Sequence, residues 1–415
     1  MAVFSVFKNT VLLLFFTLSS CGNPTKAHNK ELNSQVAQDT LATKLPIVVA
    51  ANRTEAYLPL LQGKKVGVVA NQTSVIFKDT EPLSYTHIVD SLLSLNIDIK
   101  QVFAPEHGFR GEADAGEKVS DGRDEKTGLP IISLYGKNRK PSSEQLKNLD
   151  VVLFDIQDVG VRFYTYIATM QLVMEACAQN NIPVIVLDRP NPNGHYVDGP
   201  TMETEHRGFL GMTNIPLVYG MTIGEYANMI NQEGWLENKA VANLTVIPME
   251  HYDHHKDYIL PIRPSPNLPN NTSIYLYPSL GLFEGTNVNA GRGTEFQFQR
   301  YGAPFMDSTQ YNFKYIPVPN FGSKDPKHNG KICYGKDLSQ TPKMNTVDLN
   351  YILDAYRNTK DKSLFFNNSG FTRHAGTEVL QKQIETGLSH EEIKKTWQID
   401  INRFKKIRAK YLIYN

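Results

Sequence analysis

Four short apolar runs in the first half of the chain each end in a group of polar residues. The runs are continuous, rich in β-branched residues, and cover residues 65–70, 97–103, 151–154 and 184–187. Continuous apolar runs of this length are typical of parallel strands that are buried on both faces. Helical patterns lie between them, at residues 82–95, 142–149 and 166–180. This alternation predicts an α/β fold with a Rossmann-like, doubly wound and mainly parallel sheet.

The polar residues that follow these strands are the first candidates for chemistry. In open parallel sheets, ligands bind outside the carboxyl ends of the strands, so residues from all four runs should lie at one edge. They are Asn71 after the first run, Glu106, His107 and Arg110 after the second, Asp155 and Asp158 after the third, and Arg189 and Asn191 after the fourth. Charged groups at the end of a buried strand are costly unless they are paired or have a function. Internal ion pairs are therefore the alternative interpretation.

The second half of the chain changes character. Thr222 and Glu225 form a predicted capping box that opens a helix to about Gln232, which gives Glu225 a structural role. Residues 244–247 read as a further strand, and residues 273–282 and 391–408 read as helices. From Asp307 onward the pattern is mixed α/β. We expect a catalytic domain over residues 46–270 and a smaller mixed α/β domain over residues 271–415.

The N-terminus reads as a targeting segment. Lys8 precedes an apolar stretch at residues 11–18, which is too short to span a membrane and is followed by Leu18-Ser19-Ser20-Cys21-Gly22. Small residues before a cysteine at this spacing resemble a bacterial lipoprotein cleavage site. Residues 1–20 would then be removed, Cys21 would carry the lipid, and polar residues up to 45 would form a tether. We expect an envelope lipoprotein that faces the periplasm; a plain secretory signal with an incidental cysteine is the alternative.

Composition and motifs argue against nucleic-acid-binding, nucleotide-dependent and metal-dependent proteins. Lys and Arg total 43 against 42 Asp and Glu, a net charge of +1 that offers no electrostatic footprint for nucleic acid. Neither nucleotide-binding glycine motif follows a predicted strand, so no nucleotide cofactor is expected. Apart from Cys21 the chain has only Cys177 and Cys333, too few for a cysteine-based zinc site. The His-rich stretch 249–255 lacks a metal-binding helical spacing, so we expect no metal.

Several longer strings, in one order along the chain, resemble a known family. They are Pro105-Glu106-His107-Gly108-Phe109-Arg110-Gly111, residues 154–166 (FDIQDVGVRFYTY), Leu187-Asp188-Arg189-Pro190-Asn191-Pro192, Ser265-Pro266-Asn267, Phe283-Glu284-Gly285-Thr286-Asn287 and Gly291-Arg292-Gly293-Thr294. From about Pro46 to the C-terminus they resemble the YbbC/NamZ family of exo-acting β-N-acetylmuramidases. One departure is visible, because Tyr252 and His254 stand where many members should have Trp and Arg.

The resemblance implies a glycosidase. It implies release of terminal β-1,4-linked N-acetylmuramic acid from the non-reducing end of peptidoglycan fragments, in a cleft between the two domains and without a cofactor. Its partners would be peptidoglycan saccharides or muropeptides and, through the lipid, a membrane. A lipid-anchored muropeptide-binding protein without catalysis is the alternative, but capture alone gains nothing from several cleft carboxylates.

Glycoside hydrolysis uses a carboxylic acid and, in most families, a second carboxylate. Glu106, beside His107, is the candidate acid, because a buried strand end favours a protonated carboxyl group. Asp155 or Asp158 is the candidate second carboxylate. The substrate's own acetamido group could replace it, so the sequence leaves retaining, inverting and substrate-assisted routes open.

Recognition of N-acetylmuramic acid requires a cation for its lactyl carboxylate. Arginine suits this role because its planar guanidinium can hold a carboxylate bidentately. The candidates are Arg110, Arg162, Arg189 and Arg292, although each could instead be an internal ion-pair partner. Further candidate substrate-binding residues are Asn71, Tyr164, Asn191, Glu284 and Asn287. Tyr164 could instead be a core residue next to a helix start. Glu284 and Asn287 could instead belong to a glycine-rich surface loop.

Overall fold

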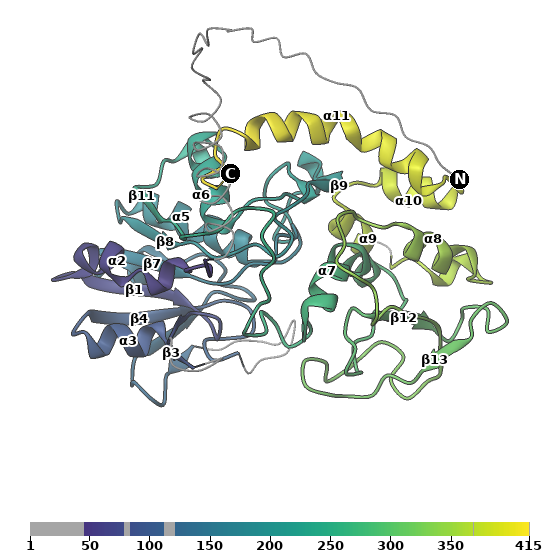
Figure 1. Ribbon diagram of the computed structural model, residues 1–415, viewed down its shortest axis with the longest axis horizontal. Coiled ribbons are helices and arrows are strands. Elements are labelled where there is room, and N and C mark those ends of the chain that lie inside the picture. The colour runs from purple at the N-terminus through teal and green to yellow at the C-terminus, as the bar shows by residue number, and fades with distance from the viewer. Residues whose placement is uncertain (1–44, 79–83, 112–120, 368, 415) are drawn as a thin grey trace, which may run out of the picture. The chain divides into compact units, whose positions relative to one another are not determined.

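The structure is a computed structural model that describes residues 45–78, 84–111, 121–367 and 369–414. Residues Ile47–Asn415 form one compact unit (Figure 1). The predicted signal peptide, the predicted lipidation site Cys21 and nearly all of the predicted tether lie outside the described residues. Within the described part, no helix is both long and apolar enough to cross a membrane.

A seven-stranded, mainly parallel sheet organises the first half of this unit. Its strand order is β11-β8-β7-β1-β4-β6-β5, with only β5 antiparallel to its neighbour. The strands are β1 (Lys65–Ala70), β4 (Asp98–Ala104), β5 (Gly122–Arg123), β6 (Pro130–Ser133), β7 (Val151–Asp155), β8 (Val184–Leu187) and β11 (Leu244–Ile247). All four predicted runs and the later strand at residues 244–247 are therefore confirmed. The predicted α/β class with a doubly wound parallel sheet is confirmed with them.

Alternate strand residues enter different hydrophobic cores, which explains the continuous apolar runs. Val68 packs in a cluster with residues of α2 (Thr54–Leu61) and α3 (Ile88–Ser94). Its neighbour Val69 packs in a second cluster with α5 (Tyr166–Gln179) and α6 (Ile223–Gln232). Because both faces are covered, no position in β1 after Lys65 can be polar without a buried partner.

The predicted helices differ from the observed ones mainly at their ends. Thr222 and Glu225 form the predicted capping box at the start of α6, and α5 matches its predicted range to within one residue. The helix predicted over residues 82–95, of which 82 and 83 lie outside the described residues, is observed as α3 from Ile88 to Ser94. Before it, Tyr85–His87 form strand β3, which pairs with β2 (Val75–Phe77). The helix predicted at 142–149 shortens to α4 (Ser143–Leu146).

Strand β6 of the main sheet, like the short β5 beside it, has no counterpart among the predicted elements. β6 extends the sheet beyond β4, and its run is short and begins with a proline. Proline is tolerated at the first position of a strand, where its missing N–H removes no essential ladder bond.

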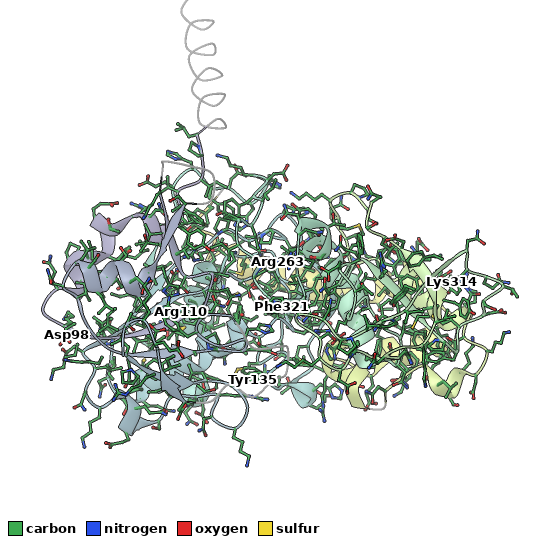
Figure 2. All side chains as sticks on the ribbon, turned by 90° about the horizontal axis from the view of Figure 1, so that it is seen from below. Asp98, Arg110, Tyr135, Arg263, Lys314 and Phe321 are labelled. Atoms are coloured by element: carbon green, nitrogen blue, oxygen red, sulfur yellow. The ribbon has the colours of Figure 1, made fainter. Side chains whose placement is uncertain are left out.

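The second half of the unit is smaller and mixed, as predicted. It contains α7 (Asn271–Leu280), a 3₁₀ turn η4 (Gly281–Gly285) and an antiparallel sheet in the order β12-β14-β13. These strands are β12 (Arg300–Ala303), β13 (Phe313–Tyr315) and β14 (Cys333–Asp337). The remaining helices are α8 (Asn350–Arg357), α9 (Ser369–Ala375), α10 (Val379–Glu385) and α11 (His390–Arg408). In Figure 2, Asp98 on β4 and Lys314 on β13 lie near opposite ends of the unit.

The chain returns to the first half at its C-terminus. Helix α11 runs back from α10 toward α6 (Figure 1), and its Lys394 pairs with Asp198 on β9 (Asp198–Thr201) at 2.6 Å. The Tyr414 hydroxyl then donates to the buried Asp188 carboxylate at 2.7 Å. One hydrophobic cluster includes residues from both halves of the unit, so the two-domain division at residue 270 stays a prediction.

Candidate active site

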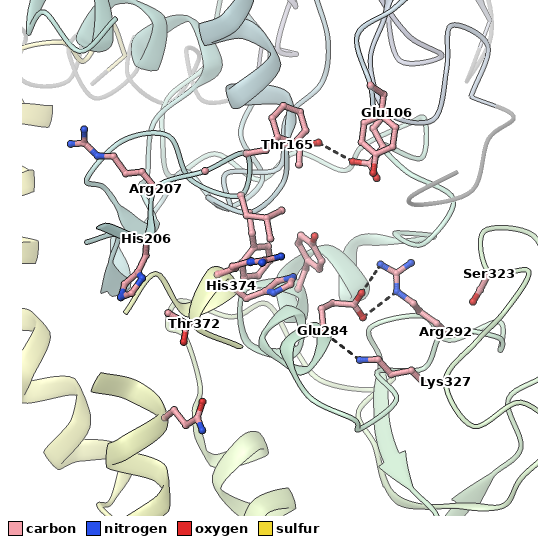
Figure 3. A pocket seen from close by; sticks show the side chains of 18 of the residues that line it. Glu106, Thr165, His206, Arg207, Glu284, Arg292, Ser323, Lys327, Thr372 and His374 are labelled. Atoms are coloured by element: carbon pink, nitrogen blue, oxygen red, sulfur yellow. Dashed lines mark hydrogen bonds and ion pairs between the residues drawn. The ribbon is translucent and has the colours of Figure 1, made fainter. Parts of the chain in front are cut away.

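A large cavity lies between the carboxyl edge of the parallel sheet and the second half of the chain. Its volume is about 1510 Å³. Segments that are far apart in the sequence line it, and Figure 3 shows several of them around one space. Its walls include Glu106, Tyr135, Arg139, Phe163, Thr165, Tyr277, Glu284, Arg292 and residues 205–210, 322–327 and 372–374. The cavity therefore brings together Glu106, Glu284 and Arg292 from the predicted site.

Glu106 enters the cavity from a tight turn after β4. The turn closes with a hydrogen bond from Gly108 N to Pro105 O at 3.0 Å, and His107 takes a left-handed φ of 71°. Thr165 Oγ1 donates to Glu106 Oε2 at 2.9 Å. Burial raises the pKa of Tyr135, and the Glu106 charge and its hydrogen bond raise it further, so this phenol stays protonated. Glu106 is thus held by two hydroxyl groups.

Unlike Glu106, His107 is not one of the residues that line the cavity. Its side chain is buried. A direct catalytic role for this imidazole has no geometric support, although its left-handed backbone shapes the turn that presents Glu106.

Glu284 lies across the cavity from Glu106 (Figure 3), at the end of η4. Arg292 pairs with it through Nε at 3.2 Å and Nη2 at 3.1 Å. Burial would raise the pKa of Glu284, but Arg292, Lys327 and His374 outweigh burial and hold it at about 2. Lys327 Nζ also donates to the carbonyls of Phe283 and Thr286 at 3.0 and 2.7 Å. Glu284 is therefore a fixed anion at neutral pH.

His374, on α9, is a further titratable group in this part of the cavity. Its Nδ1 lies 2.9 Å from the Gly370 carbonyl. Because a carbonyl only accepts, Nδ1 carries the proton and Nε2 of the neutral ring is an acceptor. Burial lowers the pKa of His374, and the Lys327 and Arg292 charges act in the same direction. At neutral pH the ring therefore offers the cavity an acceptor nitrogen.

Asp155 and Arg189 form a pair inside the sheet rather than in the cavity. Arg189 Nε and Nη2 donate to the two Asp155 oxygens at 2.6 and 2.8 Å. Both side chains are almost completely buried. Burial raises the pKa of Asp155, and the Arg189 charge opposes this shift. The pair corresponds to the ion-pair alternative, because neither residue is among those that line the cavity.

Asp158 is also buried and also absent from the cavity lining. Its Oδ2 accepts hydrogen bonds from Gly160 N at 2.7 Å and from the Tyr219 hydroxyl. Burial raises the pKa of Asp158 to about 7, against the opposing effect of these hydrogen bonds. The carboxyl group therefore organises the loop after β7.

The buried Asp158 carboxyl should make stability depend on pH. Its pKa rises from 3.8 to about 7 on folding, so its contribution is present below pH 3.8 and is lost as the pH rises through 7. Relative to Asp158→Asn, the wild type should lose about 2 to 4 kcal/mol of unfolding free energy over this interval. Urea unfolding at several pH values measures the difference, and parallel pH profiles would contradict the assignment.

Two of the remaining candidate arginines also have internal partners. Arg110 pairs with Asp124 at 2.8 Å and Asp90 at 3.4 Å, and it lines a separate cavity of about 360 Å³. Arg162 is buried, and among the described residues its guanidinium donates to backbone carbonyls. Its acceptors are Pro200, Ile215, His374 and Ala375, at 2.6 to 3.0 Å. Arg162 therefore fixes the segment that carries His374, and neither arginine lines the large cavity.

The other four predicted binding residues form hydrogen bonds with other residues of the protein. Each shapes a loop, none lines the large cavity, and direct contact with substrate stays a prediction for all four. The bonds are Thr73 N to Asn71 Oδ1 (2.9 Å), Tyr164 hydroxyl to Pro264 O (2.7 Å), Asn191 Nδ2 to Met221 O (2.8 Å) and Asn287 Nδ2 to Leu364 O (3.0 Å).

Comparison with known proteins identifies the family. The N-terminal family model of the exo-β-N-acetylmuramidase NamZ matches residues 66–272, and the C-terminal one matches residues 275–414. The chain belongs to the NamZ family. It is 39% identical over 428 aligned residues to the Bacillus subtilis (strain 168) protein named peptidoglycan β-N-acetylmuramidase NamZ, with 98% of both chains covered.

Two crystal structures of DUF1343 family proteins from Bacteroides fragilis NCTC 9343 resemble the NamZ-family fold described above. One is 42% identical with a TM-score of 0.80, and the other is 28% identical with a TM-score of 0.74. Each match covers 89% of this chain and 99% of the other chain.

Several cavity residues of this NamZ-family chain were missed at the level of sequence. Tyr135 follows β6 as Glu106 follows β4, so recognition of that strand would have identified it. Thr165 stands directly before α5, within a string quoted for the family resemblance. Lys327 and His374 belong to no local motif, and only the fold brings them to Glu284.

Proposed function

We propose that this protein is an exo-acting glycosidase that releases terminal β-1,4-linked N-acetylmuramic acid from the non-reducing end of peptidoglycan fragments. Membership of the NamZ family supports this activity, as does the named activity of the Bacillus subtilis relative. The observation that carries the mechanism is the placement of Glu106 and Glu284 in the walls of one cavity. Both groups are accessible to a sugar, unlike Asp155 and Asp158.

Glu106 is the proposed general acid. Thr165 and Tyr135 fix its carboxyl group, and a fixed acid can protonate the glycosidic oxygen as the bond to the anomeric carbon breaks. Proton transfer of this kind neutralises the leaving alkoxide in the transition state.

Glu284 is the proposed stabilising anion. The glycosyl group acquires positive charge as the bond breaks, and a carboxylate whose pKa is about 2 stays ionised throughout the reaction. The same low pKa makes Glu284 a weak proton acceptor. His374 Nε2 is the better acceptor for an attacking water or a substrate N–H, because its ring is neutral.

An aryl β-N-acetylmuramide tests the activity without a second enzyme. The purified protein should release the chromophore, with one N-acetylmuramic acid formed for each aryl group. A protein that only captures muropeptides would instead bind a muropeptide in calorimetry and release no chromophore.

We also propose that the protein is a lipoprotein of the bacterial envelope that faces the periplasm. The apolar stretch followed by Leu18-Ser19-Ser20-Cys21 supports this location, and peptidoglycan turnover takes place in the same compartment. Cys21 would then be the lipid-bearing first residue of the mature protein.

Labelled palmitate tests the lipid anchor. The wild type and a Cys177→Ala control should incorporate the label, because Cys177 is buried, whereas Cys21→Ala should not. Equal labelling of wild type and Cys21→Ala would contradict the anchor.

A further inference from the structure

The cavity requires a cation for the lactyl carboxylate that distinguishes N-acetylmuramic acid from N-acetylglucosamine. This requirement rests on the proposed function. Of the four arginines predicted from the sequence motifs to bind this carboxylate, Arg110, Arg162 and Arg189 lie outside the cavity lining. Arg292 lines the cavity, but Glu284 already occupies its Nε and Nη2 groups.

Most other cations of the cavity wall are also occupied. Lys327 directs its ammonium group to backbone carbonyls around η4, and Lys382 pairs with Glu378 at 3.3 Å. Arg139, Arg207 and Arg373 line the cavity without an ion-pair partner among the residues that the structure describes. Among the arginines of the described cavity wall, these three have guanidinium groups that no carboxylate already holds, so all their N–H groups can bind a substrate.

Arg139 is the one that aromatic packing holds in place. Its Cζ lies 4.2 Å from the centre of the Phe209 ring, and the Phe209 and Tyr135 ring centres are 6.5 Å apart. Stacking uses the face of the guanidinium and leaves the N–H groups at its edge available. The stacked geometry also lowers the number of rotamers that substrate binding must fix.

Arg139 is also the one close to the proposed acid. Glu106 and Arg139 shift the pKa of Tyr135 in opposite directions, Glu106 upward and Arg139 downward. Glu106 and Arg139 therefore both lie near Tyr135. Arg207 lies on the other side of the cavity from Glu106 in Figure 3. The lactyl group is attached to the sugar whose glycosidic oxygen Glu106 protonates, so its receptor must be near Glu106.

We propose that Arg139, stacked on Phe209, binds the lactyl carboxylate of the terminal N-acetylmuramic acid. The site consists of a guanidinium edge for the carboxylate, the Phe209 ring that orients it, and the Tyr135 hydroxyl toward Glu106. It assigns substrate selectivity to Arg139, in the segment after β6, and to Phe209; neither residue is among the predicted site residues.

The kinetic test compares an aryl β-N-acetylmuramide with its lactyl methyl ester, which lacks the negative charge. Arg139→Gln should lower kcat/KM for the acid about 10- to 100-fold, as expected for loss of a charge-assisted hydrogen-bonded pair. The same variant should change kcat/KM for the ester by about twofold or less, because the ester has no charge for Arg139 to bind. Arg139→Lys should retain part of the preference, because it keeps the charge and loses the fork. Arg207→Gln is the matched control and should behave as wild type.

Equal losses for acid and ester in Arg139→Gln, or a larger loss of acid preference in Arg207→Gln, would overturn the assignment. Calorimetry with N-acetylmuramic acid and N-acetylglucosamine tests it without turnover. Wild type should bind the former more tightly and Arg139→Gln should not, even if the proposed hydrolysis fails. Equal affinities in the wild type would also overturn it.

Discussion

Replacement of Glu106 by Gln is expected to lower kcat by about 10²- to 10⁴-fold, the usual contribution of a general acid. Glutamine preserves the size of the side chain and can still accept the hydrogen bond from Thr165, but it cannot donate a carboxylic proton to the leaving oxygen. The free energy of unfolding should change by only about 0.5 kcal/mol, since the side chain lines a cavity rather than a packed core.

Single-turnover kinetics on a poorly activated leaving group measures this effect most clearly. Thr165→Val is the matched control, because it removes a hydrogen bond to Glu106 and leaves the acid in place. It should lose less activity than Glu106→Gln. Full activity in a correctly folded Glu106→Gln protein would refute the assignment of the acid.

Replacement of Asp155 by Ala is expected to destabilise the fold by about 3 to 5 kcal/mol. The change removes the carboxylate that accepts both hydrogen bonds from Arg189 Nε and Nη2, and it leaves that guanidinium buried without this counter-charge. Equilibrium unfolding in urea measures the loss.

A double variant separates a structural role from a catalytic one. Asp155→Leu combined with Arg189→Met removes both charges and should be more stable than Asp155→Ala, because no buried charge lacks a partner. If Asp155→Ala instead kept wild-type stability and lost all activity, Asp155 would belong to the catalytic machinery.

The architecture was predictable because the sheet is buried on both faces. Adjacent residues such as Val68 and Val69 enter different cores, so each strand had to be a continuous apolar run. Capping chemistry likewise fixed the start of α6 through Thr222 and Glu225. Strand β3 was missed because its pairing with β2 interrupts an otherwise helical pattern.

The site was predictable only in part, since strand-end position does not decide whether a charge faces a cavity or a partner. Asp155 is the last residue of β7 and Arg189 follows the neighbouring parallel strand β8, so the proximity that made them candidates also lets them pair with each other. Glu106 instead lies in the cavity wall, where Thr165 and Tyr135 contact its carboxyl group. These differences depend on tertiary distances and not on local sequence.

The cation for the lactyl group illustrates the same limit. Arg162 stands in a motif string, yet its guanidinium donates to four backbone carbonyls. Two of these, from His374 and Ala375, lie more than 200 positions later in the chain. Arg139 stands in an ordinary polar stretch and reaches the cavity because residues 205–210 place Phe209 beneath it. Motif membership marked the cavity region but not the side chains that remain available to a ligand.

The tetrasaccharide MurNAc-GlcNAc-MurNAc-GlcNAc, followed by NMR with purified protein, tests the central claim most directly. An exo-acting β-N-acetylmuramidase should release one N-acetylmuramic acid and leave a trisaccharide that begins with N-acetylglucosamine and reacts no further. The first anomer detected would also report the stereochemical route. An unchanged tetrasaccharide with folded protein, or its division into two disaccharides, would contradict the account.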